Sequence, residues 1–577
     1  MLKAGGDAVG AAAATEDTPE KVNDQRKVFY ILVSKLNSLA QPLMFFPYPP
    51  SIQIERECPA GYEALTPLAS SVHQVEASTS SIHVTFTATK RFMYNAIAHT
   101  FKATNIRKSK ATTSTTNWNI FWGHHLTASE FAALLPFQRV NHFPGSFELG
   151  RKDRLCSNLL RMRKRHPQAY AGVIPETFLT ANEYDRQQFL AQFHAHPHAL
   201  WILKPPNSSC GRGIKLVTAA SGSAPKLSKK KAYVAQKYIA QPFLINELKF
   251  DLRIYVLVTS FDPLRVYLFN DGLVRFCTEK YSTSRSALQN PFGHLTNYSV
   301  NKKNTAAFQQ NQDTNEDSDD DSAFNSSKWS LEMLYRYLTE QGKTKELADF
   351  QVILEDLIIK TLLAVESKIT MVAAGAGGSH NGFELYGFDI LLEGEAMKPW
   401  LLEVNVFPSL SSSSPMDKRI KTILVSDMFQ LVGVPFVDAQ SAIQQLDRDK
   451  KERLHGVKGS IRRASMAIPP SSMQQKKSTK KQTVEELLKK GAGSGPLELS
   501  DEELEIVKQM QEEELRRGHF KRIFPTPESF AKYHELFETP RVRNVLCMLW
   551  LQRTKSHISG HRRRAQSSAV LSKPSTV

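Results

Sequence analysis

Residues 398–405 show the clearest alternation of apolar and polar side chains, and this period of two predicts a β-strand. The alternation places Leu402 and Val404 on an apolar face together with the neighbouring tryptophan. Glu403 and Asn405 then lie side by side on the opposite face, because successive side chains of a strand point to opposite sides.

A second apolar run, residues 388–392, carries Asp389, and the turn sequence at 394–396 joins the two runs as a predicted hairpin. A symmetric hairpin places Asp389 opposite Glu403. Two carboxylates that face each other repel, and burying them unpaired is costly. A Mg²⁺ ion would remove the conflict because it prefers carboxylate and amide oxygens. The alternative is a solvated polar edge of the sheet.

Upstream, the apolar run 200–203 predicts a buried strand that ends at Lys204. A loop rich in glycine and serine follows at 205–213, and a further strand is predicted at 214–217. Free N–H groups in such a loop can bind phosphate, although a plain hairpin has the same pattern. Residues 233–239 predict another strand.

The run 249–258 predicts a strand whose even-numbered residues are all apolar. Lys249, Asp251 and Arg253 share its other face, which is costly unless they serve a site or pair with each other. Residues 264–276 predict a hairpin that turns at Asp271-Gly272 and carries Arg275 on its second strand.

Helical spacing of apolar residues appears at 127–135, 328–338 and 350–372, and the stripe in the last of these, which starts at Ile353, predicts core. Residues 152–165 predict a basic helix whose charges are interpreted as a solvated face. Strands predicted at 83–86 and 117–122 indicate a small N-terminal α/β module.

The chain has 577 residues and a formal net charge of +17, which points to an acidic partner. Nucleic acid ranks last among such partners because aromatic residues do not alternate with the basic ones. Five scattered cysteines predict a reducing compartment. No signal peptide or membrane-spanning run is recognised, so a soluble intracellular protein is expected.

Several of these segments, taken in order, resemble the ATP-grasp fold and, more closely, the tubulin–tyrosine ligase-like family. The resemblance covers roughly residues 116–437. It is carried by the motifs Lys249-Phe250-Asp251-Leu252-Arg253, Leu295-Thr296-Asn297-Tyr298-Ser299, Phe388-Asp389 and Glu403-Val404-Asn405. Asn141-His142-Phe143-Pro144-Gly145 and the C-terminal Arg516-Arg517-Gly518 and Arg522-Ile523-Phe524-Pro525 are most similar to its polyglutamylase branch.

The resemblance implies roles for particular residues. ATP would be bound by Lys204, Cys210, Gly211, Gln236, Lys237, Tyr238, Ile239, Lys249, Phe250, Asp251, Thr296 and Asn297. Two Mg²⁺ ions would be held by Asp389, Glu403 and Asn405. Arg275, Tyr298, Ser299, Lys328 and Lys421 would hold the incoming glutamate and the acceptor carboxylates, and Lys204, Arg253 and Arg275 would act in catalysis.

The implied reaction is ATP-dependent polyglutamylation of acidic tubulin tails, in which an acyl phosphate on a glutamate γ-carboxylate is attacked by the amine of free glutamate. The resemblance implies a monomeric protein of the cytoplasm and cytoskeleton, with the cilium or basal body as a further location. Glycylation or tyrosination by the same fold and a microtubule-binding pseudoenzyme remain as alternatives.

The expected fold class is α/β (α+β), an ATP-grasp fold with a small N-terminal α/β module and a C-terminal helical extension. The expected division is a poorly ordered region at 1–80, the α/β module at 81–175, ATP-grasp subdomains at 176–245 and 246–438, a basic disordered linker at 439–498, a helical module at 499–555 and a disordered tail at 556–577.

Overall fold

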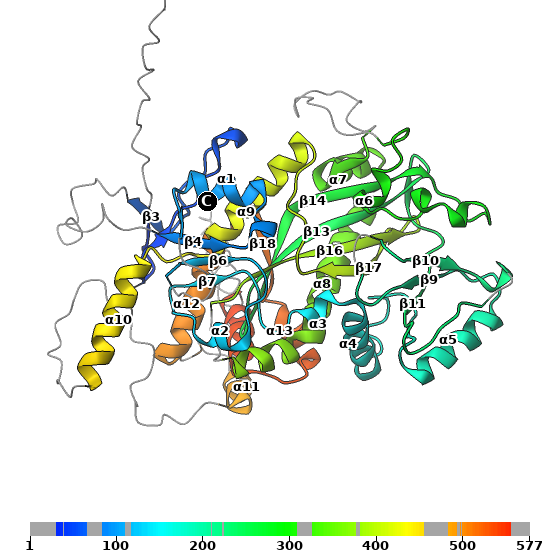
Figure 1. Ribbon diagram of the computed structural model, residues 1–577. Coiled ribbons are helices and arrows are strands. Elements are labelled where there is room, and N and C mark those ends of the chain that lie inside the picture. The colour runs from blue at the N-terminus through cyan, green and yellow to red at the C-terminus, as the bar shows by residue number, and fades with distance from the viewer. Residues whose placement is uncertain are drawn as a thin grey trace, which may run out of the picture.

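An antiparallel sheet of seven strands forms the centre of the protein, with five strands in the order β15–β14–β13–β16–β17 and β12 and β18 paired to β13 and β14 (Figure 1). The computed structural model describes residues 31–37, 40–65, 84–109, 117–208, 211–221, 224–308, 326–376, 381–454, 483–492, 497 and 499–555. The sheet consists of β12 (Leu244–Ile245), β13 (Leu248–Phe261), β14 (Leu264–Lys280), β15 (Lys328–Ser330), β16 (Glu384–Glu393), β17 (Lys398–Asn405) and β18 (Phe520–Phe524).

Strand β13 is buried on both faces, and its two faces belong to two different cores. The even-numbered Leu252 and Ile254 pack in the core beneath the sheet. On the odd-numbered face, Tyr255 and Leu257 pack in a second core above it. Asp251 and Arg253 precede these two residues on the same face, so the charged residues lie where this second apolar layer ends.

The predicted turn at Asp271-Gly272 is wrong, because β14 continues through it as one strand of 17 residues. Gly272 faces Ile254 of β13, and glycine is needed there because a Cβ would lie 2.5 Å from the carbonyl oxygen of Arg253. Asp271 does not form a turn. Its carboxylate accepts hydrogen bonds from the backbone N–H groups of Gly272 and Leu331.

The predicted β16–β17 hairpin is confirmed, and its register pairs Asp389 with Glu403. A β-bulge between these partners and the next pair interrupts the alternation. Leu401 and Val404 therefore face the core, and Leu402 lines a cavity on the other side. The expectation that Leu402 shares an apolar core face with Val404 is wrong for this reason.

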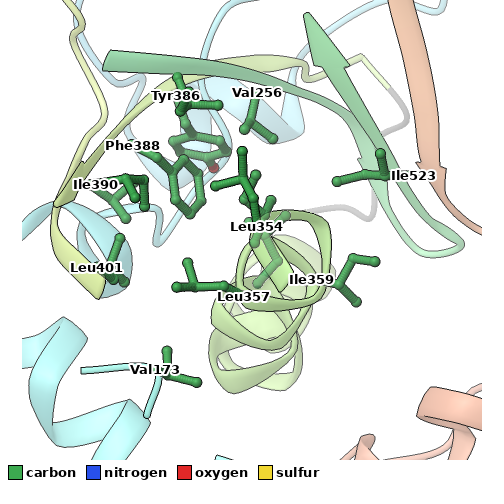
Figure 2. Packing of buried hydrophobic residues seen from close by; sticks show 14 of the residues in the cluster. Val173, Val256, Leu354, Leu357, Ile359, Tyr386, Phe388, Ile390, Leu401 and Ile523 are labelled. Carbon is green, nitrogen blue, oxygen red and sulfur yellow. The ribbon is translucent and has the colours of Figure 1, made fainter. Parts of the chain in front are cut away.

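Helix α8 (Thr344–Gly375) lies under the sheet and supplies much of the first core. Figure 2 shows Leu354 of this helix pointing toward the strands that carry Val256 and Phe388. Ile353 is 45% exposed, so its assignment to the core stripe is wrong. The predicted helix at 328–338 starts later, because residues 328–330 form β15 and α7 spans Leu331–Glu340.

Two smaller sheets flank the central one. The four-stranded sheet β10–β9–β11–β8 contains β8 (Thr177–Leu179), β9 (Trp201–Lys204), β10 (Lys215–Val217) and β11 (Val234–Lys237), and it packs with α5 (Glu183–Ala195). The parallel sheet β5–β4–β6–β7 contains β4 (Thr85–Ala88), β5 (Arg107–Lys108), β6 (Ile120–Trp122) and β7 (Arg139–Val140). The latter, with α1 (Asn95–Ala103) and α2 (Ala128–Ala132), confirms the predicted strands and helix of an N-terminal module.

The two ends of the described chain contact each other. A three-stranded sheet forms early, from β1 (Ile31–Ser34), β2 (Leu43–Met44) and β3 (Tyr62–Leu65), in a region expected to be poorly ordered. It packs on α12 (Asp501–Arg516), where Leu515 contacts Gly61 and Arg516 donates a hydrogen bond to Tyr62. Helix α12 begins with a capping box formed by Ser500 and Glu503.

The C-terminal segment is not only helical, since β18 pairs with β14 in the central sheet. Glu513 of α12 is buried and accepts hydrogen bonds from Thr259 and Tyr267. Within the segment expected to be a disordered linker, α10 (Ala439–Leu454) and α11 (Val484–Ala492) are helical. The remaining elements include α3 (Phe147–Gly150), α4 (Lys152–Arg165), α6 (Tyr298–Asn301), α9 (Pro415–Val432) and α13 (Ser529–Tyr533).

Among the described residues, no helix combines the length and the apolar character that crossing a membrane requires.

Candidate active site

A cavity lies where the four-stranded sheet meets the central sheet. The basic and acidic side chains that line it come from strands of both sheets, from the loop after β9 and from the start of α4. The charged residues of the lining are Lys152, Lys204, Arg212, Lys237, Lys249, Asp251, Asp389 and Glu403.

Strand register, rather than loop conformation, aligns the charged residues. Lys328 of β15 pairs with Arg275 of β14, which pairs with Asp251 of β13. Two positions further along β13, Arg253 pairs with Asp389 of β16, and that residue pairs with Glu403. These two parallel rows of side chains are called the charged rows below.

Asp389 lies between two guanidinium groups. Its carboxylate oxygens are 2.6 Å from Nε of Arg253 and 2.9 Å from Nη2 of Arg275. Burial alone would raise its pKa, but the two neighbouring arginines hold the pKa of Asp389 well below its usual range. Arg275 also binds both carboxylate oxygens of Asp251, with distances of 2.6 and 2.7 Å. The pairing of Asp251 with Arg253, considered from the sequence, is therefore replaced by an Asp251–Arg275 pair.

The predicted oxygen ligands for a divalent ion come close together. Asp389 and Glu403 line the same cavity from neighbouring strands, and the Asn405 amide lies 3.5 Å from the Glu403 carboxylate. Glu403 is paired with Lys152 at 2.7 Å. Two carboxylates and an amide whose charge is balanced by cationic groups fit the donor set of Mg²⁺.

Two buried lysines face this cavity from opposite sheets. Lys204 donates to the side-chain oxygen of Gln236 at 2.8 Å, and burial lowers its pKa to about 8. Lys249 donates to the Tyr238 hydroxyl at 2.8 Å and to the His294 carbonyl at 3.1 Å, and burial also lowers its pKa. An anionic ligand would stabilise the charged form of both groups.

The structure brings together most of the residues predicted to bind a nucleotide. The cavity is lined by Lys204, Gly211, Gln236, Lys237, Tyr238, Ile239, Lys249, Asp251, Thr296 and Asn297. Phe250 is a correction, because it is 1% exposed and points into the core on the other face of β13. Cys210 lies outside the described residues.

The loop after β9 approaches the 294–297 loop closely at Gly211. Its φ of +71° is one that other residues rarely adopt, and a Cβ there would lie 2.8 Å from the Asn297 side-chain oxygen. Glycine at this position therefore lets the two loops meet over the cavity.

The residues predicted to bind carboxylate substrates form a second group next to the first. Lys328 Nζ lies 4.4 Å from the centre of the Tyr298 ring, and Ser299 follows Tyr298 in α6. Lys421 Nζ lies 2.6 Å from Asp417, and Lys328 Nζ lies 3.3 Å from the same carboxylate. Arg275 lies between this group and the cavity, because it pairs with Lys328 on one side and with the cavity residue Asp251 on the other.

Sequence reasoning missed Lys152, His294 and Asp417. Lys152 is the first residue of α4, and its interpretation as part of a solvated face is wrong because it lines the cavity and pairs with Glu403. The only indication of this role in the sequence was the acidic residue at position 403, with which a lysine can pair. His294 lies one residue before the motif that starts at Leu295. Asp417 follows a run of serines at 411–414, and nothing in this local sequence indicates a site.

The Asn141–Gly145 motif builds a separate buried cluster. His142 Nδ1 lies 2.7 Å from Glu384, and His125 Nε2 lies 3.8 Å from the same carboxylate. These three side chains are close enough to hold a metal ion, but the two imidazoles are stacked at 17° with centres 4.2 Å apart. An ion cannot lie in both ring planes in this arrangement, so the cluster fits a hydrogen-bonded support for β16.

The antiparallel central sheet, the flanking four-stranded sheet and the cavity between them define an α+β protein of the ATP-grasp-like class. The sequence profile of the Tubulin-tyrosine ligase family matches residues 130–442, more than half of the chain. The chain therefore belongs to the tubulin–tyrosine ligase family.

Three curated relatives illustrate the similarity. Human tubulin monoglutamylase TTLL4 is 37% identical over 439 residues, which cover 76% of this chain and 35% of that protein. Mouse tubulin polyglutamylase TTLL5 is 37% identical over 440 residues, covering 75% and 31%. Caenorhabditis elegans tubulin polyglutamylase ttll-4 is 33% identical over 431 residues, covering 74% and 66%. The chain spans about a third of the length of the two mammalian relatives.

Proposed function

We propose that this protein is an ATP-dependent ligase that adds glutamate to glutamate side chains in the acidic tails of tubulin. The observation that carries the proposal is the arrangement of the charged rows, which lead from Glu403 and Asp389 at the cavity to Lys328 beside it. The names of the relatives, which are tubulin monoglutamylases and polyglutamylases, agree with this chemistry.

The cavity would hold ATP with Mg²⁺. Lys204 and Lys249 would bind phosphate oxygens, the Gln236–Ile239 segment would border the adenine, and Thr296 and Asn297 would complete the site. Asp389, Glu403 and Asn405 would hold two Mg²⁺ ions, which would neutralise the phosphates when bound.

The reaction would proceed in two steps. An acceptor γ-carboxylate attacks the γ-phosphorus of ATP, which forms an acyl phosphate and releases ADP. The amine of free glutamate then attacks the acyl carbon, an isopeptide bond forms, phosphate leaves, and the amine loses its proton. Arg253 would stabilise charge on the transferred group, because it pairs with Asp389, which lines the cavity.

The donor glutamate would lie against the second group of cations. Arg275, Lys328 and Lys421 supply positive charge for its carboxylates, and Tyr298 and Ser299 border the same place. Because Nε and Nη2 of Arg275 already bind Asp251 and Asp389, Nη1 would be its contact to the donor.

The acceptor would be an acidic segment, in keeping with the net charge of +17. We propose that the protein works as a monomer in the cytoplasm on the cytoskeleton, with the cilium or basal body as a further location.

The direct test is to incubate the purified chain with tubulin, ATP, Mg²⁺ and labelled glutamate, and to locate the label by mass spectrometry of the tubulin tails. Unlabelled glutamate, glycine and tyrosine are added as competitors in parallel. Label on tail glutamates that only glutamate competes away is the expected result. Competition by glycine or tyrosine would reassign the donor, and microtubule binding without nucleotide binding would identify a pseudoenzyme.

A further inference from the structure

A buried carboxylate connects the two lysines that flank the proposed donor site. Asp417 is 0% exposed. One of its oxygens lies 2.6 Å from Nζ of Lys421, and the other lies 3.3 Å from Nζ of Lys328. The two lysines come from α9 and β15, so Asp417 links the helix to the edge of the central sheet.

The start of α9 fixes the Asp417 side chain. Ser414 is the N-cap and accepts a hydrogen bond from the backbone N–H of Asp417, with Pro415 at the first helical position. The N–H of Ser413 donates to Asp417 at 3.0 Å. A carboxylate in the first turn of a helix is also stabilised by the helix dipole. The carboxylate therefore has a fixed position before either lysine binds it.

Each lysine also donates a hydrogen bond to a serine that precedes α9. Lys421 also donates to the carbonyl of Ser411 at 2.5 Å, and Lys328 donates to the Ser413 hydroxyl at 2.8 Å. Among the charged groups that act most strongly on Lys421, Asp417 of the same helix is negative, whereas Lys328 of β15 and Arg253 of β13 are positive. Without this carboxylate, two buried ammonium groups would repel each other beside a guanidinium.

We propose that Asp417 is a positioning residue that holds Lys328 and Lys421 charged and in place to bind the carboxylates of the donor amino acid. The inference rests on the proposed function, and it adds a residue that acts through the lysines and does not contact the donor itself. It predicts that the loss of Asp417 weakens donor binding more than it slows the transfer step.

The test compares Asp417→Asn with Asp427→Asn in the full-length protein. Both aspartates lie on α9, both are 0% exposed, and Asp427 is paired with Arg56 and His519 away from the site. The KM for free glutamate and kcat are measured at saturating ATP and tubulin. Asp417→Asn is expected to raise the KM about tenfold or more with kcat changed by less than about threefold, the size of one lost contact to a charged group. Asp427→Asn is expected to keep the wild-type KM.

A pH series adds a readout that a purely structural role would not move. Burial lowers the pKa of Lys421 to about 8 despite the opposing effect of Asp417. Removing the carboxylate lowers this pKa further, so the rise of the glutamate KM with pH is expected to begin at lower pH in Asp417→Asn than in the wild type.

A second pair of variants covers the case in which Asp417→Asn does not fold. Lys328→Met/Lys421→Met, with and without Asp417→Asn, removes both lysines alone or together with their shared partner. If Asp417 acts through its lysines, the triple variant has a glutamate KM within about threefold of that of Lys328→Met/Lys421→Met. Wild-type KM in Asp417→Asn, or equal KM increases in both Asp→Asn variants, would overturn the inference. Absence of glutamate transfer by the wild type would instead reject the proposed function.

Discussion

Replacing Glu403 by glutamine separates the proposed metal role of this residue from any structural role. The side chain is 23% exposed, and it forms an ion pair with Lys152, which is 15% exposed. The pair is half-buried and still reached by water, and ion pairs that water reaches contribute about 0–1 kcal/mol. The substitution keeps the shape of the side chain, so the free energy of unfolding is expected to fall by less than about 1 kcal/mol.

The effect on activity is expected to be much larger. Glutamine keeps one oxygen but removes the negative charge that a Mg²⁺ ion would require at this position, and a lost electrostatic contact to a phosphoryl-transfer transition state costs about 10²-fold or more in rate. Transfer of labelled glutamate and binding of a non-hydrolysable ATP analogue are measured over a range of Mg²⁺ concentrations. The variant is expected to need more Mg²⁺ to bind the analogue.

The control is Glu393→Gln, which lies at the far end of the same hairpin and accepts a hydrogen bond from Trp400. It is expected to leave glutamate transfer unchanged. Wild-type transfer in Glu403→Gln would refute the metal assignment. A loss of about 3 kcal/mol or more in unfolding free energy, the size expected when one partner of a buried pair is removed, would mean that the pair with Lys152 is structural.

Three further outcomes are expected. Asp389→Asn leaves two guanidinium groups without their shared carboxylate, so urea unfolding is expected to show a loss of about 3–5 kcal/mol, and an unchanged midpoint would contradict the geometry. The pKa of Lys204 is about 8 because of its burial, so ATP affinity is expected to weaken as pH rises through this value in the wild type and to stay level in Lys204→Arg, whose side chain remains charged; parallel titration curves would count against a phosphate contact. Burial raises the pKa of Glu366 from 4.5 to about 7, so its contribution to stability is complete below pH 4.5 and is lost as pH rises through 7. Relative to Glu366→Gln, the wild type is expected to lose on the order of 3 kcal/mol of unfolding free energy between pH 5 and 8 in denaturant titrations. Equal pH dependence of the two proteins would show that the carboxylate is not buried in solution.

Those parts of the site that depend on local alternation could be predicted from the sequence. Asp389 and Glu403 lie opposite each other because a short turn fixes the register of the hairpin. The same alternation indicates that Phe250 faces the core, so its assignment to the nucleotide site came from the motif alone and was wrong. The pattern of residue types does not predict the bulge that turns Leu402 toward the cavity.

Residues that depend on distant contacts could not be predicted. Lys152 pairs with a residue about 250 positions away, and a basic helix with this pattern is usually solvated. The strands at 31–65 are buried in part by α12, at the other end of the chain, and a local pattern does not reveal so distant a partner. The same applies to β18, whose partner strand precedes it by roughly 250 residues.

That late strand has a consequence for synthesis on the ribosome. All residues that line the cavity have been synthesised once residue 405 has emerged, but the edge positions of β14 that β18 later takes are still open. An uncovered strand edge is a template for association with other chains. The nascent polypeptide therefore has an unpaired strand edge while roughly another hundred residues are translated. A message truncated in that interval would yield a product prone to aggregation.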